Sequence, residues 1–270
     1  SLPTVLAHCG IRGFSTQKLT WGAVVPIPFK VGVWEGPDGS SVIAALDPGA
    51  YVGDVREDLS KSESWLQRIN KNGEKSGVFV DYHYYGTGDQ GGAPKEPTVA
   101  MVEKSAVNGA AAGAKIRVMS MRADAMFNAI SDEQRAKLPR YKGELELTEH
   151  SAGSISSQAY MKRWNRKNEL LADAAEKAST MAWWLGASDY PAARLEKAWG
   201  LVLGSQMHDI LPGTSVPLAY DLSWNDEVIA ANQFGAALTE GARGVISAMN
   251  TNVEGTPIVV FNPLSWERRD

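Results

Sequence analysis

A histidine and an aspartate stand side by side, His208 and Asp209, in the stretch SQMHDILPGTS at residues 205–215. This stretch follows an apolar, helix-like segment, and Pro212 and Gly213 are expected to stop that helix. A neutral imidazole suits zinc, and a carboxylate next to it could accept hydrogen bonds from hydroxyl groups. Adjacent helical residues point about 100° apart, so the pair predicts one metal ligand and one neighbouring contact. The alternative is a surface histidine beside a turn-capping aspartate.

A second candidate lies in the sequence GTGDQG at residues 86–91, which matches the glycine pattern of dinucleotide-binding proteins. Two features count against that interpretation. Pro94 and Pro97 delay the next helix, whose N-terminus should meet the pyrophosphate, and Asp124 lies farther downstream than the usual ribose contact. Asp89 could instead be a catalytic acid at the C-terminal end of a barrel strand, or an ordinary turn aspartate.

Trp34 is a third candidate, in the stretch VWEGPDGS at residues 33–40. The chain has nine tryptophans, a number that suits aromatic platforms for sugars, although packing is the commoner use of this side chain. Gly32, two residues before it, suggests a place where another group approaches the backbone closely. Trp34 is therefore expected either beneath a sugar or in the core.

Composition limits the class of protein. The 270 residues carry a net charge of −4, which argues against nucleic acid as the main partner, and no stretch is long and apolar enough to span a membrane. Cys9 is the only cysteine, so an internal disulfide and a cysteine-rich zinc site are excluded. The sequence contains no HExxH, so further ligands for a zinc at His208 would come from elsewhere. The opening SLPTVLAHCG predicts an interior piece of a longer polypeptide and specifies no compartment.

The elements that would position these residues fall into two parts. Up to residue 150, short apolar runs alternate with helical patterns, which predicts a parallel α/β sheet, open or closed. One exception is a hairpin whose two runs flank Asp38 and Gly39. Strands are expected at 76–85 and 115–121, and helices at 55–71, 98–111 and 123–138.

Beyond residue 150 the pattern changes to long helical periods, at 154–186, 191–210 and 223–249. Short links between them predict an antiparallel three-helix bundle, and a β element is expected at 258–261. On a helix over 191–210, the apolar residues gather on one face and His208 falls roughly opposite. His208 is thus expected to face away from the bundle, toward the α/β part.

Several stretches together resemble one family. They occur in this order: GFSTQKLTW, VWEGPDGSSV, YGTGDQGGAP, GELELTEHSAGSISSQAYMKRWNRKNELL, AWGLVLGSQMHDILPGTS and VVFNPLSW. This order is similar to that of glycoside hydrolase family 38, the α-mannosidases, and the strongest match is a Gln-x-His-Asp-Ile-Leu-Pro-Gly motif. The resemblance covers nearly the whole chain but only the middle of the family's full length.

The resemblance implies a fold. Residues 1–150 would be the C-terminal part of a catalytic β/α barrel. Residues 151–255 would be a three-helix bundle, the α-mannosidase middle domain, and residues 256–270 would start a C-terminal β domain. The family hydrolyses terminal α-mannosides of oligosaccharides with retention, using zinc.

The resemblance also implies roles for particular residues. His208 would be a zinc ligand, Asp209 a contact to mannose hydroxyls, Asp89 the general acid/base, and Trp34 a residue near the sugar-binding subsite. The loop around Asp89 reads GDQGGA where the family has a GDGGGG-like sequence, and HSAG around His150 replaces the family's HRGT.

The family's early His-x-Asp zinc pair and its nucleophilic aspartate are absent and are expected upstream of Ser1. The chain by itself is therefore expected to be inactive, with the rest of its own polypeptide and an α-mannoside as partners. Two other hypotheses stay open from the residues alone. One is an NAD(P)-dependent oxidoreductase using GTGDQG, and the other is a non-catalytic helical-bundle module that binds protein or carbohydrate.

Overall fold

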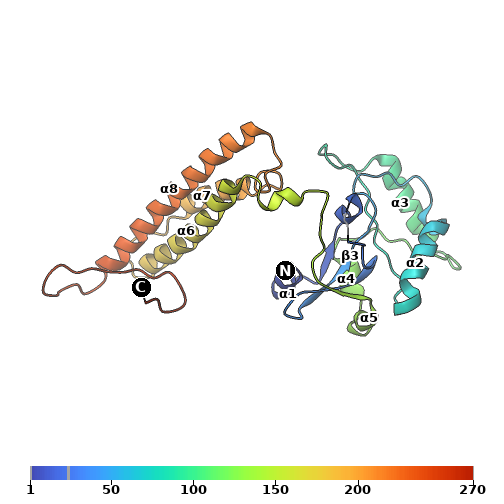
Figure 1. Cartoon of the computed structure of the whole chain (residues 1–270), viewed down its shortest axis with the longest axis horizontal. Coiled ribbons are helices and arrows are strands. Elements are labelled where there is room, and N and C mark those ends of the chain that lie inside the picture. The colour runs from blue at the N-terminus through green and yellow to red at the C-terminus, as the bar shows by residue number, and fades with distance from the viewer. Residues whose placement is uncertain (1, 23–24, 270) are drawn as a thin grey trace. The chain divides into compact units, whose positions relative to one another are not determined.

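The computed structural model describes residues 2–22 and 25–269. The chain divides into two compact units, Ser1–Ala152 and Gly153–Asp270. In Figure 1 the first unit runs from blue to green, and the second from yellow-green to red.

The first unit is built on a four-stranded sheet. Its strands are β1 (Gly13–Ser15), β2 (Val31–Glu35), β3 (Ser41–Ala45) and β4 (Arg140–Lys142), in the order β1-β3-β2-β4. The predicted hairpin is present, because β2 and β3 pair antiparallel and the Gly36 amide donates to the Ser40 carbonyl at 2.9 Å. The pairs β1–β3 and β2–β4 are parallel. The sheet is therefore mixed. Its two outer pairs are parallel, and the predicted hairpin supplies the antiparallel pair at the centre, because two strands joined by a five-residue turn must run in opposite directions.

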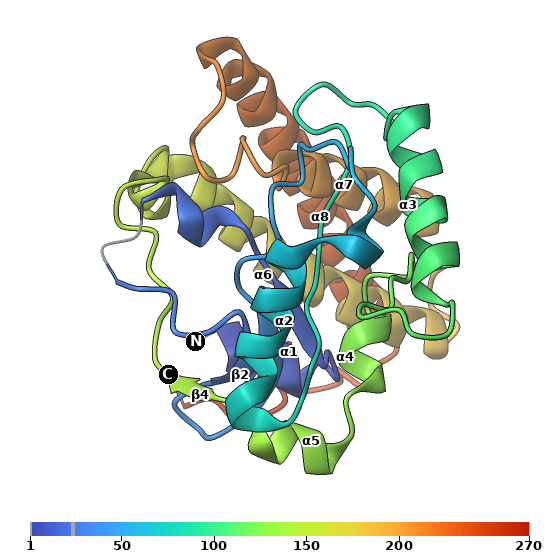
Figure 2. The ribbon, with the colours of Figure 1, turned by 90° about the vertical axis from the view of Figure 1, so that its right-hand side faces the viewer.

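The first unit also contains helices and short turns, and Figures 1 and 2 label its helices. They are α1 (Leu2–His8), α2 (Glu63–Ser76), α3 (Glu96–Gly109), α4 (Ala125–Ala129) and α5 (Asp132–Lys137), with short 3₁₀ turns at Lys18–Trp21, Leu59–Lys61 and Ala152–Ile155. The last of these turns spans the division between the units.

Successive residues of the hairpin strands point to opposite faces of the sheet, and both faces are buried. Val31, Val33, Ile43 and Ala45 pack with Met126 and Phe127 of α4 and with Ile130 and Leu138, which flank α5. Trp34 and its neighbours on the opposite face pack beneath α1 and the 145–147 segment. The hairpin is thus the centre of the unit and carries a core on each side.

Two expected strands are not strands in the structure. Residues 78–85 and 116–121 have no ladder partner among the described residues. Val78 and Ile116 are nevertheless buried. Their apolar pattern therefore predicted burial correctly, but burial alone does not supply the neighbouring backbone that a strand needs. A single bridge, between Gly53 and Gly86, ends the first of these segments.

The expected helix over 123–138 is divided into α4 and α5. Ser131 separates them with a capping box: its hydroxyl accepts from the Gln134 amide at 3.2 Å, and the Gln134 side chain accepts from the Ser131 amide at 2.9 Å. The signal for this break is in the sequence, as Ser-x-x-Gln, but a continuous helical pattern hides it.

The second unit consists mainly of α6 (Ala159–Trp184), α7 (Ala192–Ser205) and α8 (Pro217–Ser247), so the expected helical content is present. Successive helices run in opposite directions. The Trp199 indole donates to Glu176 across α6 and α7, and Arg194 of α7 pairs with Glu240 of α8. The outer helices α6 and α8 consequently run parallel to each other.

Small residues fill the seam between α6 and α8. Ala172, Ala175 and Ala178 of α6 are fully buried. A Cβ added at Gly241 of α8 would lie 2.7 Å from the carbonyl carbon of Ala178, so this glycine allows the two backbones to meet. Close packing of this kind depends on the absence of larger side chains.

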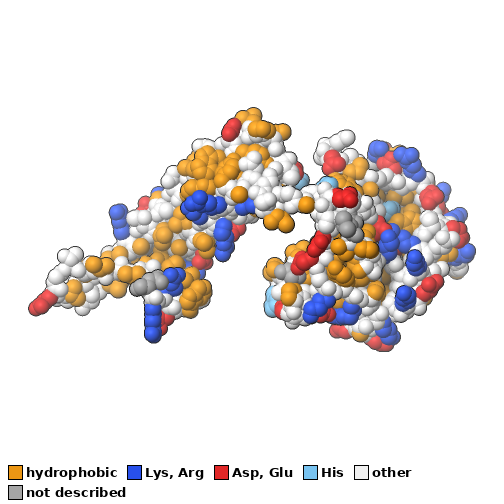
Figure 3. Space-filling view, in the orientation of Figure 1, with side chains coloured by type: hydrophobic (Ala, Val, Ile, Leu, Met, Phe, Trp, Pro, Cys, Tyr) orange, Lys and Arg blue, Asp and Glu red, His pale blue; other side chains and the backbone are white. Residues whose placement is uncertain are grey.

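The final segment, 250–269, has no strand among the described residues, although a β element was expected at 258–261. Ile258 and Val260 are 87% and 86% exposed. Their alternating apolar pattern indicates a strand, but nothing described pairs with it, and an unpaired segment cannot form a ladder. Apolar side chains are also visible elsewhere on this unit in Figure 3. Within the described residues, no helix is both long and apolar enough to cross a membrane.

Candidate active site

Asp89 lies in the loop that leads from the 78–85 segment to α3. The loop is tied to another by two backbone hydrogen bonds, from the Gly53 amide to the Gly86 carbonyl at 2.9 Å and from the Gly86 amide to the Gly53 carbonyl at 3.0 Å. Asp89 has a φ of 63°, a left-handed conformation that non-glycine residues adopt rarely. Such conformations often occur where a functional side chain must be aimed.

The helix after this loop, α3, begins at Glu96 with Lys95 as its N-cap. Gly91, the last glycine of the GTGDQG pattern, is therefore five residues before the helix. A dinucleotide-binding loop needs the helix N-terminus at the last glycine, against the pyrophosphate. The position of α3 thus argues against a nicotinamide cofactor.

Tyr51 contacts Asp89 from the other loop. Its phenol donates to Asp89 Oδ1 at 2.7 Å, and the Tyr51 amide donates to the Gln17 side chain at 2.6 Å. The hydrogen bond to Asp89 raises the pKa of Tyr51, with burial and the negative charge of Asp89 acting in the same direction. Sequence reasoning missed Tyr51, because no local signal predicts a contact between residues 38 positions apart.

Aromatic and cationic groups continue from Tyr51. The Lys18 ammonium lies 5.0 Å from the centre of the Tyr51 ring and 3.6 Å from that of Trp21. The His150 ring meets Trp21 edge to face, with centroids 4.9 Å apart. The surface beside Asp89 therefore combines a carboxylate, a phenol, an ammonium and an indole within the first unit.

His208 and Asp209 lie beyond the end of α7, which stops at Ser205. The expected helix over 191–210 is therefore too long, and an argument from helical angles does not apply to His208. The chain tightens instead, since the Gln206 amide is shared by the carbonyls of Val202 and Leu203. A turn ending in Gly213, whose φ is 88°, follows.

The two side chains contact each other. His208 is 85% exposed, and its Nε2 lies 3.3 Å from Asp209 Oδ2. The Thr214 hydroxyl donates to Asp209 Oδ1 at 2.9 Å, while the Asp209 carbonyl accepts from the Thr214 amide at 3.0 Å and from the Tyr220 hydroxyl at 3.2 Å. Asp209 therefore closes the turn, and His208 presents an accessible imidazole on it.

Trp34 lies in the core of the first unit. It is 3% exposed, its ring packs on Phe14 at 5.2 Å, and its indole nitrogen donates to the Gly143 carbonyl at 2.7 Å. These contacts favour the packing alternative over a platform beneath a sugar.

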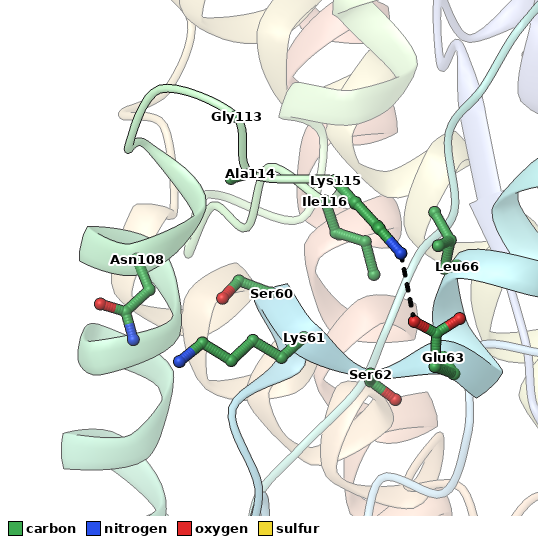
Figure 4. Close-up of a pocket in the computed structure, with 10 residues that line it drawn as sticks. All are labelled: Ser60, Lys61, Ser62, Glu63, Leu66, Asn108, Gly113, Ala114, Lys115 and Ile116. Atoms are coloured by element: carbon green, nitrogen blue, oxygen red, sulfur yellow. Dashed lines mark hydrogen bonds and ion pairs between the residues drawn. The ribbon is translucent and has the colours of Figure 1, made fainter.

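A separate pocket of about 350 Å³ lies between the start of α2 and the loop after α3 (Figure 4). It contains none of the residues predicted from the sequence. Its lysines already have acidic partners, since Lys115 pairs with Glu63 at 3.4 Å and Lys61 with Asp58 at 3.9 Å. The pocket offers no free cation for an anionic ligand.

No group of three or more histidine, cysteine, aspartate and glutamate side chains gathers around a possible metal position in the described residues. The donor set nevertheless includes one residue that suits zinc. With Asp209 beside Nε2, the other imidazole nitrogen of His208 is available to a metal, and a carboxylate contact of this kind commonly orients a ligating histidine.

Comparison with known families decides where the chain belongs. The family model "Glycosyl hydrolases family 38 N-terminal domain" matches residues 1–144. The chain belongs to glycoside hydrolase family 38. A second model, "Alpha mannosidase middle domain", matches residues 149–250 of this family 38 chain. The resemblance noted in the sequence is confirmed.

Curated relatives cover nearly all of the family 38 chain. Human alpha-mannosidase 2C1 is 30% identical over 270 residues, which are 99% of this chain and 24% of that protein. Alpha-mannosidase G of Dictyostelium discoideum is 31% identical over 97% of this chain and 22% of that protein. The family 38 chain thus spans about a quarter of the length of these relatives.

Solved structures agree in fold. The crystal structure of an alpha-mannosidase from Enterococcus faecalis V583 matches with a TM-score of 0.61 and 19% identity, over 91% of this family 38 chain and 28% of that one. A second family 38 protein from Enterococcus faecalis matches with a TM-score of 0.57 and 18% identity, over 91% of this chain and 26% of that one.

Proposed function

We propose that this family 38 chain is the central part of a retaining, zinc-dependent α-mannosidase that removes terminal α-mannose from oligosaccharides. The observation that carries the proposal is the pair of family matches over residues 1–144 and 149–250, together with relatives that are named as α-mannosidases. Because the chain spans about a quarter of those relatives, the activity is proposed for a longer protein that contains it.

Within that protein we propose three parts. Residues 1–150 are the C-terminal part of a catalytic β/α barrel, residues 151–255 the middle domain, and residues 256–270 the start of a β domain. The parallel pairs β1–β3 and β2–β4 and the tied loops at Gly53 and Gly86 support the barrel. The unpaired, exposed segment around Ile258 and Val260 supports a strand whose partners lie elsewhere in the polypeptide.

Asp89 is proposed as the general acid/base. A retaining glycosidase needs two carboxyl groups, a nucleophile and a residue that first gives a proton to the leaving oxygen and later accepts one from water. The exposed position of Asp89 on a glycine-rich loop and its left-handed backbone support this role. We propose that the nucleophile lies outside the 270 residues.

His208 and Asp209 are proposed to serve zinc and substrate respectively. Zinc would be held by His208 and by ligands outside these residues, and when bound it would coordinate sugar hydroxyls and favour ring distortion. The accessible imidazole of His208 supports the zinc assignment. The Asp209 carboxylate can accept hydrogen bonds beyond the one from Thr214, which supports the substrate assignment. For Trp34, the burial and the contacts with Phe14 and the Gly143 carbonyl support core packing rather than sugar contact.

The alternatives have less support. An oxidoreductase using GTGDQG would need a helix N-terminus at Gly91, and α3 begins at Glu96. A non-catalytic bundle module would use only the second unit, whereas the family match extends through the first.

The proposal is tested in the longer protein with three variants. Asp89→Asn should lower turnover of an aryl α-mannoside by about 100-fold or more, as expected for loss of a general acid/base. His208→Ala should lower both zinc content, measured by atomic emission, and turnover. Asp209→Asn should keep zinc and lower turnover roughly 10- to 100-fold, the cost of one charge-assisted hydrogen bond. Full zinc and full turnover in His208→Ala would overturn the metal assignment.

The 270-residue chain gives a further test. We expect it to hydrolyse no aryl α-mannoside and to retain no stoichiometric zinc after dialysis against a chelator, because zinc sites commonly have at least three protein ligands. Turnover by this chain, free of contaminating enzyme, would show that the missing groups are not outside it.

A further inference from the structure

The contact between Tyr51 and Asp89 uses one oxygen of the carboxylate. The phenol donates to Oδ1 at 2.7 Å. A carboxyl group has two oxygens, and a proton that moves to a sugar must travel from the one that faces it. A donor fixed on Oδ1 therefore distinguishes two atoms that are otherwise equivalent.

We infer that Tyr51 is a positioning residue for Asp89, which holds Oδ1 and leaves Oδ2 as the oxygen that exchanges a proton with the substrate. This inference rests on the proposed role of Asp89 as general acid/base. When the glycosidic bond breaks, its electron pair stays on the leaving oxygen, which takes the proton from Oδ2. The sugar carbon bonds to the nucleophilic carboxylate, and Tyr51 keeps its own proton throughout.

The Tyr51 ring is itself held in place. Its backbone amide donates to Gln17, a side chain that is 4% exposed, and the Gly53–Gly86 bridge ties its loop to that of Asp89. The ring also lies against Gly88, where an added Cβ would be 2.1 Å from the ring carbon Cε2. Only glycine at position 88 leaves room for this arrangement.

The conformation of Asp89 supports the same conclusion. A left-handed backbone costs free energy in a non-glycine residue and persists where the surroundings stabilise it. The tied loops, the buried Gln17 side chain and Gly88 together hold this exposed hydrogen bond. Together these features aim the carboxylate, and the productive geometry of an acid/base must be kept within a fraction of an ångström.

The first experiment tests the contact in the 270-residue chain. The protein is labelled with ¹³C at tyrosine Cζ, and the Tyr51 signal is assigned by its loss in Tyr51→Phe. Asp89 raises the pKa of Tyr51, so Asp89→Asn should lower the midpoint of the Tyr51 titration. Asparagine is the appropriate substitution because it tolerates the left-handed backbone. Lys18 is the other charged group beside this ring and is unchanged in the variant. An identical Tyr51 midpoint in both proteins would overturn the inference.

The second experiment tests the role in the longer protein. Rates are compared for an aryl α-mannoside with an activated leaving group, which departs with little help from a proton, and for an alkyl α-mannoside, which needs one. Tyr51→Phe should lower kcat/KM, which reports the steps up to glycosidic-bond cleavage, about 10-fold for the alkyl substrate. It should barely affect kcat/KM for the activated substrate. Tyr85→Phe is the matched control, because its hydroxyl partner is Ser120, at 3.4 Å.

A glycine pair provides an independent variant. Gly88→Ala should reproduce the Tyr51→Phe pattern by pushing the ring away, whereas Gly92→Ala, in the same loop, adds a Cβ no closer than 3.3 Å to Thr87 and should have a smaller effect.

Equal loss of rate for both substrates in Tyr51→Phe would overturn the positioning role. If Asp89→Asn itself shows no dependence on the leaving group, the inference falls with the proposed function. The Tyr51 titration still reports the contact in that case, which separates this failure from absence of the hydrogen bond.

Discussion

Replacing Glu227 with glutamine should stabilise the second unit at neutral pH. Glu227 is fully buried in α8, and Asn168 of α6 donates from Nδ2 both to its Oε2 and to its backbone carbonyl, the latter at 3.0 Å. Its other oxygen, Oε1, accepts no hydrogen bond from a described residue, and Asn168 Oδ1 and the Ser205 hydroxyl are also buried without a partner. Burial raises the pKa of Glu227, and the hydrogen bond from Asn168 opposes the rise.

The sign of the pH dependence follows from that shift. A carboxyl group whose pKa is raised by folding holds its proton more tightly in the folded state than in the unfolded state. Its contribution to stability is therefore most favourable below the unfolded pKa and is lost as pH rises through the folded pKa. At neutral pH the folded wild-type chain either buries the Glu227 charge or keeps Glu227 protonated at a pH where the unfolded chain releases the proton. Both lower the free energy of unfolding.

A glutamine at position 227 does not titrate. Its amide nitrogen is a hydrogen-bond donor beside a buried acceptor that has no partner among the described residues, Asn168 Oδ1. An unsatisfied buried polar group costs about 1–3 kcal/mol, so Glu227→Gln should raise the free energy of unfolding by about 1–2 kcal/mol at pH 7.5. For a unit of roughly 100 residues this is an increase in Tm of about 4–16 °C. Below the unfolded pKa the difference from wild type should shrink, because both side chains are then uncharged.

The measurement is thermal unfolding of the 270-residue chain by circular dichroism from pH 4 to pH 8, with the helical signal of the second unit as the readout. Glu240→Gln is the matched control. Glu240 is on the same helix but 58% exposed and paired with Arg194, so this change should alter the free energy of unfolding by less than about 1 kcal/mol. A pH-independent Tm difference between wild type and Glu227→Gln, or a lower Tm at pH 7.5, would refute the reasoning.

Three further outcomes are expected. Gly241→Ala should destabilise the second unit by about 1–3 kcal/mol, because the added Cβ would meet the backbone of α6. Gly235→Ala on the same helix has nothing within 4 Å of the added carbon and should stabilise the unit by roughly 0.5–1 kcal/mol. Urea denaturation measures both, and equal effects would contradict the close packing of α6 on α8. Arg68→Met should destabilise the first unit by about 3 kcal/mol, because the Asp81 carboxylate is 3% exposed and loses its ion pair, while Arg56→Met, 85% exposed, should change little. Calorimetric titration with NAD or NADP should show no saturable binding, and a micromolar Kd would return the oxidoreductase to consideration.

Local patterns predicted the elements whose stability is local. The Asp38-Gly39 turn specified the hairpin, and long apolar periods specified α6 and α8. The pattern did not specify where α7 ends, because apolar residues continue to Leu211. The helix ends at Ser205, and the turn that follows it is closed by hydrogen bonds to the Asp209 carbonyl from Thr214 and Tyr220, which come from later in the chain.

The candidate site divides in the same way. Residue types, glycine spacing and the family resemblance predict Asp89, His208 and Asp209 as candidates. They do not predict Tyr51, because its importance depends on a distance between two loops, and Trp34 is ambiguous because a tryptophan on a β-rich run suits a core as well as a surface. Residue type predicts which chemistry is possible, whereas contacts between distant segments determine which atoms take part.

The alanine seam between α6 and α8 has a consequence for how the second unit is synthesised. A ribosome releases α6 and α7 before α8, and short isolated helices owe most of their stability to packing. Until α8 leaves the exit tunnel, the alanine face of α6 has no parallel partner, so the nascent unit should remain sensitive to protease. Released chains that end at residue 216 and at residue 250 would separate the two states, because protease protection should appear only in the chain that contains the last helix.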